Sequence, residues 1–180
     1  MTYNARMGPR IGFIAQRATG YVIGVVVCLF VSAVLARVYT GHGYILPTAC
    51  VSNLKQVGLT FLMYENDYDD RLPPSSKWMD RLDPYRKDEH ILHCPELINP
   101  NGGSADITET SPYGYAMDRF LENVVTTKLP EPEKMPLAYE STDLGRSATG
   151  FLTDVPNPGR HHGRNYLVYL DGHAKWFQGR

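Results

Sequence analysis

The stretch that most constrains the fold is residues 18–36, which contains no charged residue and lies between Arg17 and Arg37. At 1.5 Å per residue, a helix of this length extends over about 28 Å, close to the hydrocarbon thickness of a bilayer. A buried helix of a globular protein usually has a polar face, and this stretch has none. The sequence therefore predicts a transmembrane anchor. The alternatives are a buried core helix and a cleaved signal peptide, with small residues for cleavage at Val34-Leu35-Ala36.

The charged residues on either side give the predicted anchor a direction. Arg6, Arg10 and Arg17 precede it, together with no acidic residue. This excess of positive charge favours a cytoplasmic N-terminus. The predicted organisation is a cytoplasmic tail over residues 1–17, an anchor over 18–38 and an exported domain over 48–180. The matching localisation is the inner (cytoplasmic) membrane, single-pass, with the C-terminal domain periplasmic or extracytoplasmic.

The part of the chain after the anchor has the composition of one small domain. All 19 acidic residues lie there, and no lysine or arginine cluster accompanies them. A mildly acidic surface without a basic patch argues against nucleic-acid binding. Cys50 and Cys94 also lie there, and an exported location permits a disulfide between them. Two cysteines alone specify little, so unpaired thiols remain the alternative.

Hydrophobic periodicity predicts two helices and several strands. An amphipathic helix is expected over residues 50–68 and a short one over 78–82. The expected buried face of the longer helix contains Val51, Leu54, Gly58, Phe61, Leu62 and Tyr68, with Val57 at its edge and Thr60 on the opposite face. Leu59 and Met63 lie off this stripe.

The strands are expected over residues 113–117, 136–140, 165–170 and 173–177, with residues 145–159 as a loop. Asp171-Gly172 joins the last two strands and is a hairpin signal, because a two-residue turn needs φ > 0 at both positions. The predicted fold class is α+β, with the amphipathic helix packed on a small antiparallel sheet.

Two motifs of the chain resemble a known family. The first is Cys50-x-Ser-Asn-Leu-Lys-Gln-Val-Gly-Leu, continued by the acidic stretch up to Pro74. The second is His161, nine further residues, and then Asp171-Gly172. Together they resemble the pseudopilin-like family that has a prepilin-type N-terminal segment and a C-terminal H-X9-DG motif. The resemblance covers residues 50–177.

The resemblance implies a pilin-like, non-enzymatic structural subunit of a type II secretion or pilus-like apparatus. Its partners would be the membrane and other pseudopilin subunits or secretion machinery, with no nucleic acid and no cofactor. In the family the amphipathic helix is the assembly element, and Leu59 and Met63 are apolar residues left for a neighbour.

The N-terminal segment departs from the family pattern, because Arg17 stands where family members have a glutamate. This departure supports an alternative function, a membrane-anchored extracytoplasmic binding module with the same fold, for example for glycans. The aromatic residues that would supply its stacking surfaces are Tyr113, Tyr115, Tyr166, Tyr169 and Trp176.

An exported hydrolase or metalloprotein is a third interpretation, resting on His161, Asp171, His173 and an acidic cluster. A six-residue strand between His161 and Asp171 would hold them roughly 17–20 Å apart, so we expect no joint site. The acidic cluster is Glu65, Asp67, Asp69 and Asp70, and it lacks the glycine that a calcium loop needs. With no phosphate-binding loop and no hydrolase motif, the sequence predicts no catalytic, cofactor-binding or metal residue.

Overall fold

The computed structural model describes residues 10–41, 45–100 and 106–178. The chain divides into two compact units, Met1–His42 and Gly43–Arg180, which we describe separately. Residues 1–9 of the predicted cytoplasmic tail lie outside the described residues.

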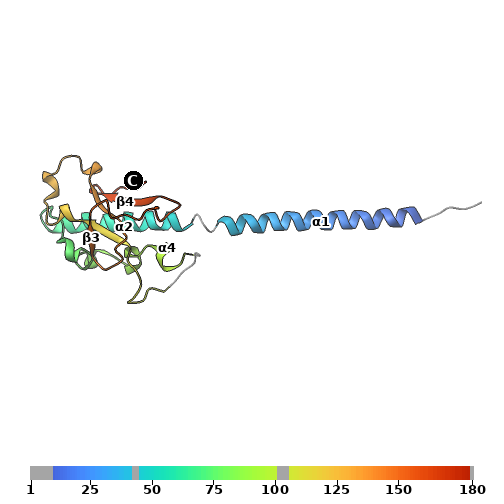
Figure 1. Cartoon of the computed structure of the whole chain (residues 1–180), viewed down its shortest axis with the longest axis horizontal. Coiled ribbons are helices and arrows are strands. Elements are labelled where there is room, and N and C mark those ends of the chain that lie inside the picture. The colour runs from blue at the N-terminus through green and yellow to red at the C-terminus, as the bar shows by residue number, and fades with distance from the viewer. Residues whose placement is uncertain (1–9, 42–44, 101–105, 179–180) are drawn as a thin grey trace, which may run out of the picture. The chain divides into compact units, whose positions relative to one another are not determined.

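The described part of the first unit is the long helix α1 (Arg10–Gly41), shown in blue in Figure 1. Within the described residues, no helix combines the length and the apolar character needed to cross a bilayer. The predicted transmembrane helix and the single-pass inner-membrane localisation are therefore wrong.

The second unit begins with α2 (Ile45–Asp67), followed by the short helices α3 (Trp78–Leu82) and α4 (Pro95–Ile98). Helix α3 has the bounds predicted from the sequence. Helix α2 begins five residues before its predicted start at Cys50, because Pro47 is tolerated in the first turn of a helix. Short 3₁₀ helices fill the connections: Ser75–Lys77, Asp83–Tyr85, Glu89–Leu92, Arg119–Leu121, Thr126–Lys128 and Pro132–Lys134.

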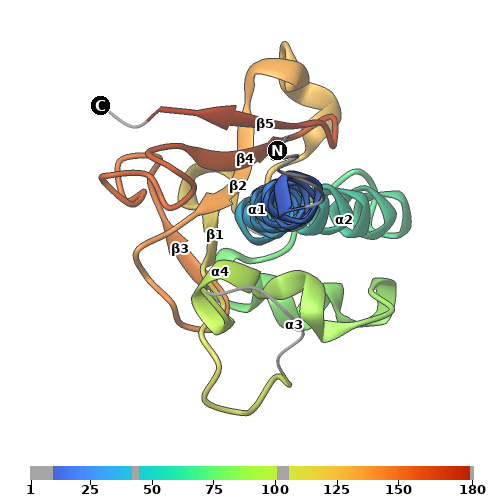
Figure 2. The same cartoon turned by 90° about the vertical axis from the view of Figure 1, so that its right-hand side faces the viewer.

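The sheet contains β1 (Tyr115–Asp118), β2 (Pro136–Glu140), β3 (Ala148–Gly150), β4 (Asn165–Tyr169) and β5 (Ala174–Phe177). Its order is β3-β1-β2-β4-β5, and Figure 2 shows α2 beside the sheet. Strands β1 and β3 run parallel, and the other neighbours run antiparallel. The α+β class is thus confirmed, whereas the predicted antiparallel sheet is mixed.

The main core lies between α2 and one face of the sheet. Leu54 and Phe61 are fully buried there, as predicted, and the Phe61 ring stacks on Trp78 with centroids 5.4 Å apart. Thr60 is buried as well, against prediction, because its hydroxyl donates to Val57 O at 2.7 Å. Tyr68 is exposed, also against prediction, because α2 ends one residue before it.

Strand β4 separates the two sides of the sheet as the sequence predicts. Val168 and Leu170 pack in the main core with α2, and Tyr166 packs against it. Leu167 belongs to a second, smaller core on the opposite face, where Tyr169 packs. The alternation predicted for residues 166–170 is confirmed, because a strand directs successive side chains to opposite faces.

The turn between β4 and β5 differs from the predicted two-residue turn. Gly172 N donates to Tyr169 O at 2.9 Å, and Tyr169 N donates to His173 O at 2.9 Å, which closes a three-residue loop. Gly172 has φ +82°, whereas Asp171 is not among the positive-φ residues. A three-residue hairpin loop needs only one left-handed residue, at the glycine, so the expectation of two was wrong.

Candidate functional site

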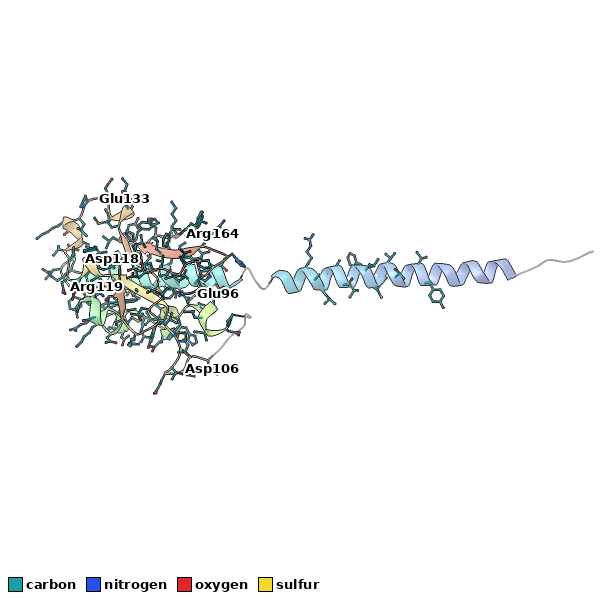
Figure 3. All side chains as sticks on the ribbon, in the orientation of Figure 1. Glu96, Asp106, Asp118, Arg119, Glu133 and Arg164 are labelled. Atoms are coloured by element: carbon teal, nitrogen blue, oxygen red, sulfur yellow. The ribbon has the colours of Figure 1, made fainter. Side chains whose placement is uncertain are left out.

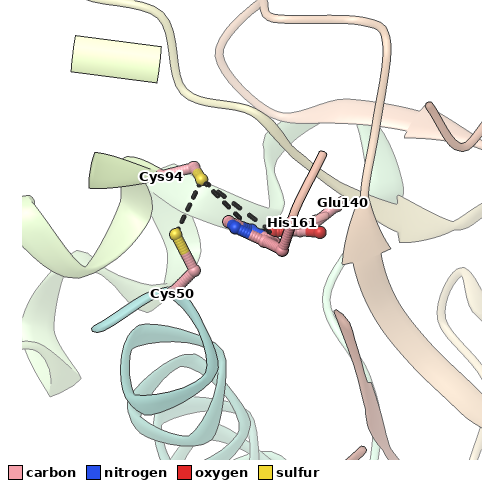
Figure 4. Close-up of side chains that lie close together, drawn as sticks. All are labelled: Cys50, Cys94, Glu140 and His161. Carbon is pink, nitrogen blue, oxygen red and sulfur yellow. Dashed lines mark hydrogen bonds and ion pairs between the residues drawn. The ribbon is translucent and has the colours of Figure 1, made fainter. Parts of the chain in front are cut away.

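Four polar side chains converge inside the second unit: Cys50, Cys94, Glu140 and His161 (Figure 4), here called the Cys–His–Glu cluster. The first three are 0% exposed and His161 is 2% exposed. One ligand atom from each residue lies within 4.8 Å of the corresponding atoms of the others.

Each of the four residues is positioned by a different element. Cys50 lies in the early turns of α2, and Cys94 is the N-cap residue of α4, where its backbone N–H donates to Tyr113 O at 3.0 Å. Glu140 is the last residue of β2. His161 precedes β4. The cluster therefore joins the first helix of the unit to the segment that enters its C-terminal hairpin.

A tight turn holds His161 in place. His161 N donates to Arg164 O at 2.9 Å, and Arg164 N donates back to His161 O at 3.1 Å. The two residues between them, His162 and Gly163, both have positive φ, 51° and 82°. This is the two-residue turn of mirror-image type that fits twisted strands, and it explains the glycine of the His-His-Gly sequence.

The two thiols lie closest together at the centre of the cluster. Their Sγ atoms are 2.8 Å apart, and both cysteines are free thiols. Cys94 Sγ lies 3.8 Å from Glu140 Oε1 and 3.8 Å from His161 Nε2. His161 Nε2 is also in direct contact with Glu140 Oε1.

The far atoms of the histidine and the glutamate have their own partners. His161 Nδ1 forms an ion pair with Glu96 Oε2, a residue of α4. Tyr166 N donates to Glu140 Oε2 at 3.0 Å. In Figure 3, Glu96 lies at the end of the domain where α2 begins, and Asp118 and Arg119 lie toward the other end. The contacts of His161 Nδ1 with Glu96 and of Glu140 Oε2 with Tyr166 N fix the imidazole and the carboxylate, so that Nε2 and Oε1 face the thiols.

The electrostatics of the cluster distinguish the two thiols. The hydrogen bond from Cys50 lowers the pKa of Cys94, with His161 and Arg160 acting in the same direction, and the same bond raises the pKa of Cys50. Burial lowers the pKa of His161, but its bonds to Cys94 and Glu140 outweigh this and raise it to about 10. Burial raises the pKa of Glu140, and the imidazole opposes that rise. The direct contact between His161 and Glu140 favours the pair of a protonated imidazole and an ionised carboxylate.

Two sulfurs, one imidazole nitrogen and one carboxylate oxygen are donors that a transition metal accepts. The adjacent thiols are equally the reactants of a disulfide. Sequence reasoning singled out three of these residues, the two cysteines as a candidate disulfide and His161 as a motif residue. It missed Glu140 and the supporting Glu96, which lie in distant segments without a ligand spacing such as Cys-x-x-Cys.

Comparisons were made with protein-family models, with curated proteins and with solved structures. None of the three finds a match for this chain. The family resemblance therefore rests on the motifs of the sequence.

The other motif residues lie apart from the cluster. Asp171 is at the hairpin turn, where its Oδ1 accepts from His173 N at 3.1 Å and from the His173 ring at 2.6 Å. Gly172 occupies the left-handed position of the same turn. The structure thus gives His161 and Asp171 different partners and does not bring them together.

The acidic residues weighed as calcium ligands also have separate partners. Glu65 is buried and accepts from Thr126 Oγ1 at 2.8 Å. Asp67 accepts from Tyr85 Oη at 2.8 Å. Asp69 and Asp70 follow α2 with left-handed backbones, φ 52° and 56°. Their contacts are those of a helix end followed by a turn.

The aromatic residues proposed for glycan stacking are mostly covered. Tyr115 is fully buried, and Tyr113, Tyr166 and Tyr169 are partly buried against the two cores or neighbouring rings. Trp176 is 48% exposed, and the Arg164 guanidinium lies 4.4 Å from its ring centroid. Most of these rings therefore serve packing rather than a stacking surface.

Proposed function

We propose that the chain is a structural, pseudopilin-like subunit of a type II secretion or pilus-like apparatus, and not an enzyme. The motifs at residues 50–74 and 161–172 support this assignment. The first motif forms most of α2, and the second spans the turn at His161 and the hairpin at Gly172. Both motifs thus serve one structural arrangement, a helix packed on a sheet.

The observation that carries the proposal is an apolar patch on α2, formed by Leu59, Leu62 and Met63 and here called the α2 patch. Leu59 is 56% exposed and Met63 is 51% exposed. With Asn66, Asp67 and Tyr85, these residues line a shallow hollow of about 410 Å³. Burying apolar surface stabilises an assembly by roughly 25 cal/mol per Å². A neighbouring pseudopilin-like subunit that covers the patch would provide that burial.

The burial of the Cys–His–Glu cluster supports a non-enzymatic role. All four side chains are at most 2% exposed. A catalytic group must reach its substrate within hydrogen-bond distance. Side chains sealed between a helix and a sheet do not meet this condition, so their polar groups serve the fold.

Site-specific photo-crosslinking in the cells that make the protein tests this proposal. A crosslinking amino acid at Leu59 or Met63 should give a product that contains a second pseudopilin-like subunit, identified by mass spectrometry. The same group at Glu133 is the matched control, because this residue is exposed on a 3₁₀ helix and Figure 3 shows it at the periphery of the domain.

A double substitution provides the functional arm. Leu59→Asp with Met63→Asp should abolish assembly while leaving thermal unfolding of the purified chain nearly unchanged, since exposed substitutions usually alter stability by less than about 0.5 kcal/mol. Normal assembly of this variant, together with equal crosslinking from Glu133 and Leu59, would refute the role of the α2 patch.

A further inference from the structure

The Cys–His–Glu cluster gathers more polar groups than a sealed core normally holds. Its members come from α2, the N-cap of α4, β2 and the turn before β4. A buried carboxylate is costly unless a partner compensates its charge. Glu140 is 0% exposed, and its Oε1 contacts His161 Nε2 and lies 3.8 Å from Cys94 Sγ, so its charge is compensated inside the cluster.

The supporting contacts have the arrangement found around metal ligands. A histidine that binds a metal through one ring nitrogen usually donates from the other to a carboxylate or carbonyl. His161 Nδ1 is in ion-pair contact with Glu96 Oε2, although not in hydrogen-bond geometry, and this leaves Nε2 directed at the cluster. Glu140 is held by Tyr166 N at its Oε2, which leaves Oε1 directed at the cluster.

From this geometry we propose that the cluster binds a structural Zn²⁺ ion through Cys50 Sγ, Cys94 Sγ, Glu140 Oε1 and His161 Nε2. Zinc takes four such ligands tetrahedrally, and a site with four protein ligands is closed to substrate. Bond lengths near 2.0–2.3 Å place tetrahedral ligand atoms roughly 3.3–3.8 Å apart. The separations from Cys94 Sγ to Nε2 and to Oε1, 3.8 Å each, match this geometry.

Zinc binding requires a small expansion and a release of protons. The sulfurs are 2.8 Å apart, and Nε2 and Oε1 are in direct contact, so both pairs would separate by about 1 Å around the ion. Both cysteines bind as thiolates, and Nε2 of His161 binds without its proton, so the thiol and imidazolium protons leave to solvent. The double positive charge of the ion then offsets two of the three negative charges on its ligands, which are the two thiolates and the Glu140 carboxylate.

A disulfide between Cys50 and Cys94 is the competing state. It would use the two sulfurs alone and would need an oxidant to accept two electrons. In that state Glu140 Oε1 and His161 Nε2 would keep their contact with each other, but neither would have a hydrogen bond to sulfur. The convergence of all four donors therefore favours zinc over the disulfide.

Metal and thiol content of the purified full-length chain decide between these states. After dialysis against metal-free buffer, mass spectrometry of the elements should find about one zinc ion per chain. Denaturation with a chelator and without reductant should then reveal all three cysteine thiols. In the wild-type chain, replacement of zinc by Co²⁺ should give thiolate-to-cobalt charge-transfer absorption, a readout that needs no substitution.

Two variants with different cysteines provide the matched comparison. Cys94→Ser should reduce bound zinc at least tenfold, whereas Cys28→Ser should retain it, because Cys28 lies in α1 outside the cluster. Zinc-free wild-type chain with a single reactive thiol would show a disulfide and overturn the proposal. Zinc-free chain with three thiols would overturn it equally. Neither result depends on assembly, so the zinc site and the proposed function fail separately.

Discussion

Gly58 of α2 lies against Val168 of β4 so closely that a Cβ atom on the glycine would stand 2.6 Å from Val168 Cγ2. The same Cβ would stand 3.4 Å from the backbone of Gly172 in the hairpin loop. The missing side chain therefore sets the distance between α2 and the C-terminal hairpin.

This contact predicts that Gly58→Ala lowers the free energy of unfolding, the opposite of its usual effect in a helix. In an exposed helix interior, the change from glycine to alanine stabilises by about 1 kcal/mol. Here overpacking against Val168 should outweigh that gain and destabilise the domain by about 1–2 kcal/mol in urea denaturation. Val168→Ala removes the facing methyl, so the double variant should be more stable than the sum of the single effects predicts. Additive changes in unfolding free energy would show that Gly58 and Val168 do not contact each other.

Phe61→Ala should destabilise the domain more than either Gly58→Ala or Leu59→Ala. The ring is fully buried and stacked on Trp78, and truncating such a residue costs about 3–5 kcal/mol. Leu59→Ala, two residues earlier on the exposed side, should cost less than about 0.5 kcal/mol. Denaturant midpoints measure both changes, and equal losses would mean that the helix faces are misassigned.

Gly172 should tolerate asparagine better than valine. Its φ of +82° is strained for a β-branched residue, whereas asparagine enters the left-handed region more readily. Gly172→Val should destabilise the domain by more than about 1 kcal/mol. Both substitutions place a Cβ 2.9 Å from Leu62 Cδ1, so this clash is common to them. The difference between their unfolding midpoints therefore reports mainly the strain of the left-handed backbone. The measurement is thermal unfolding by circular dichroism, and indistinguishable midpoints would count against the turn assignment.

Glu65 should make the domain less stable as the pH rises. Burial raises the pKa of its carboxyl above the ordinary 4.5, despite the opposing bond from Thr126. The folded state therefore holds the proton more tightly than the unfolded state, so its stabilising effect is complete below pH 4.5 and is lost as the pH rises through the folded pKa. Glu65→Gln keeps an oxygen for Thr126 and removes this titration.

The difference in unfolding free energy between wild type and Glu65→Gln should grow in favour of the variant from about pH 4.5 upward and then level off. Urea denaturation at a series of pH values measures it. Parallel curves across this range would show that Glu65 titrates alike in both states.

Local periodicity explains which elements could be predicted. Helix α3 and strand β2 have their predicted bounds, and the alternation of Leu167 and Val168 assigned the two faces of β4 correctly. Strand β3 was missed because its three residues are too short to show alternation, and its parallel partner β1 lies about 30 residues earlier.

The cluster was only partly predictable for a related reason. His161 and the two cysteines are residue types that often bind metals or form disulfides, whereas Glu140 looks in the sequence like an ordinary residue at the end of a strand. Only the long-range pairing of β2 with β4 brings Glu140 beside His161. The predicted anchor was wrong for a different reason: an uncharged run does not by itself provide the length and apolar character of a span, which no described helix has.

The sheet order has a consequence for how the domain is completed during translation. The ribosome delivers β2 before β4, so the central strand first exists with β1 on one side and an unpaired edge on the other. Cys94 emerges 67 residues before His161, and Cys50 earlier still. Until β4 is synthesised, a nascent chain therefore has both cysteines without His161 and the open edge of β2 without its partner strand.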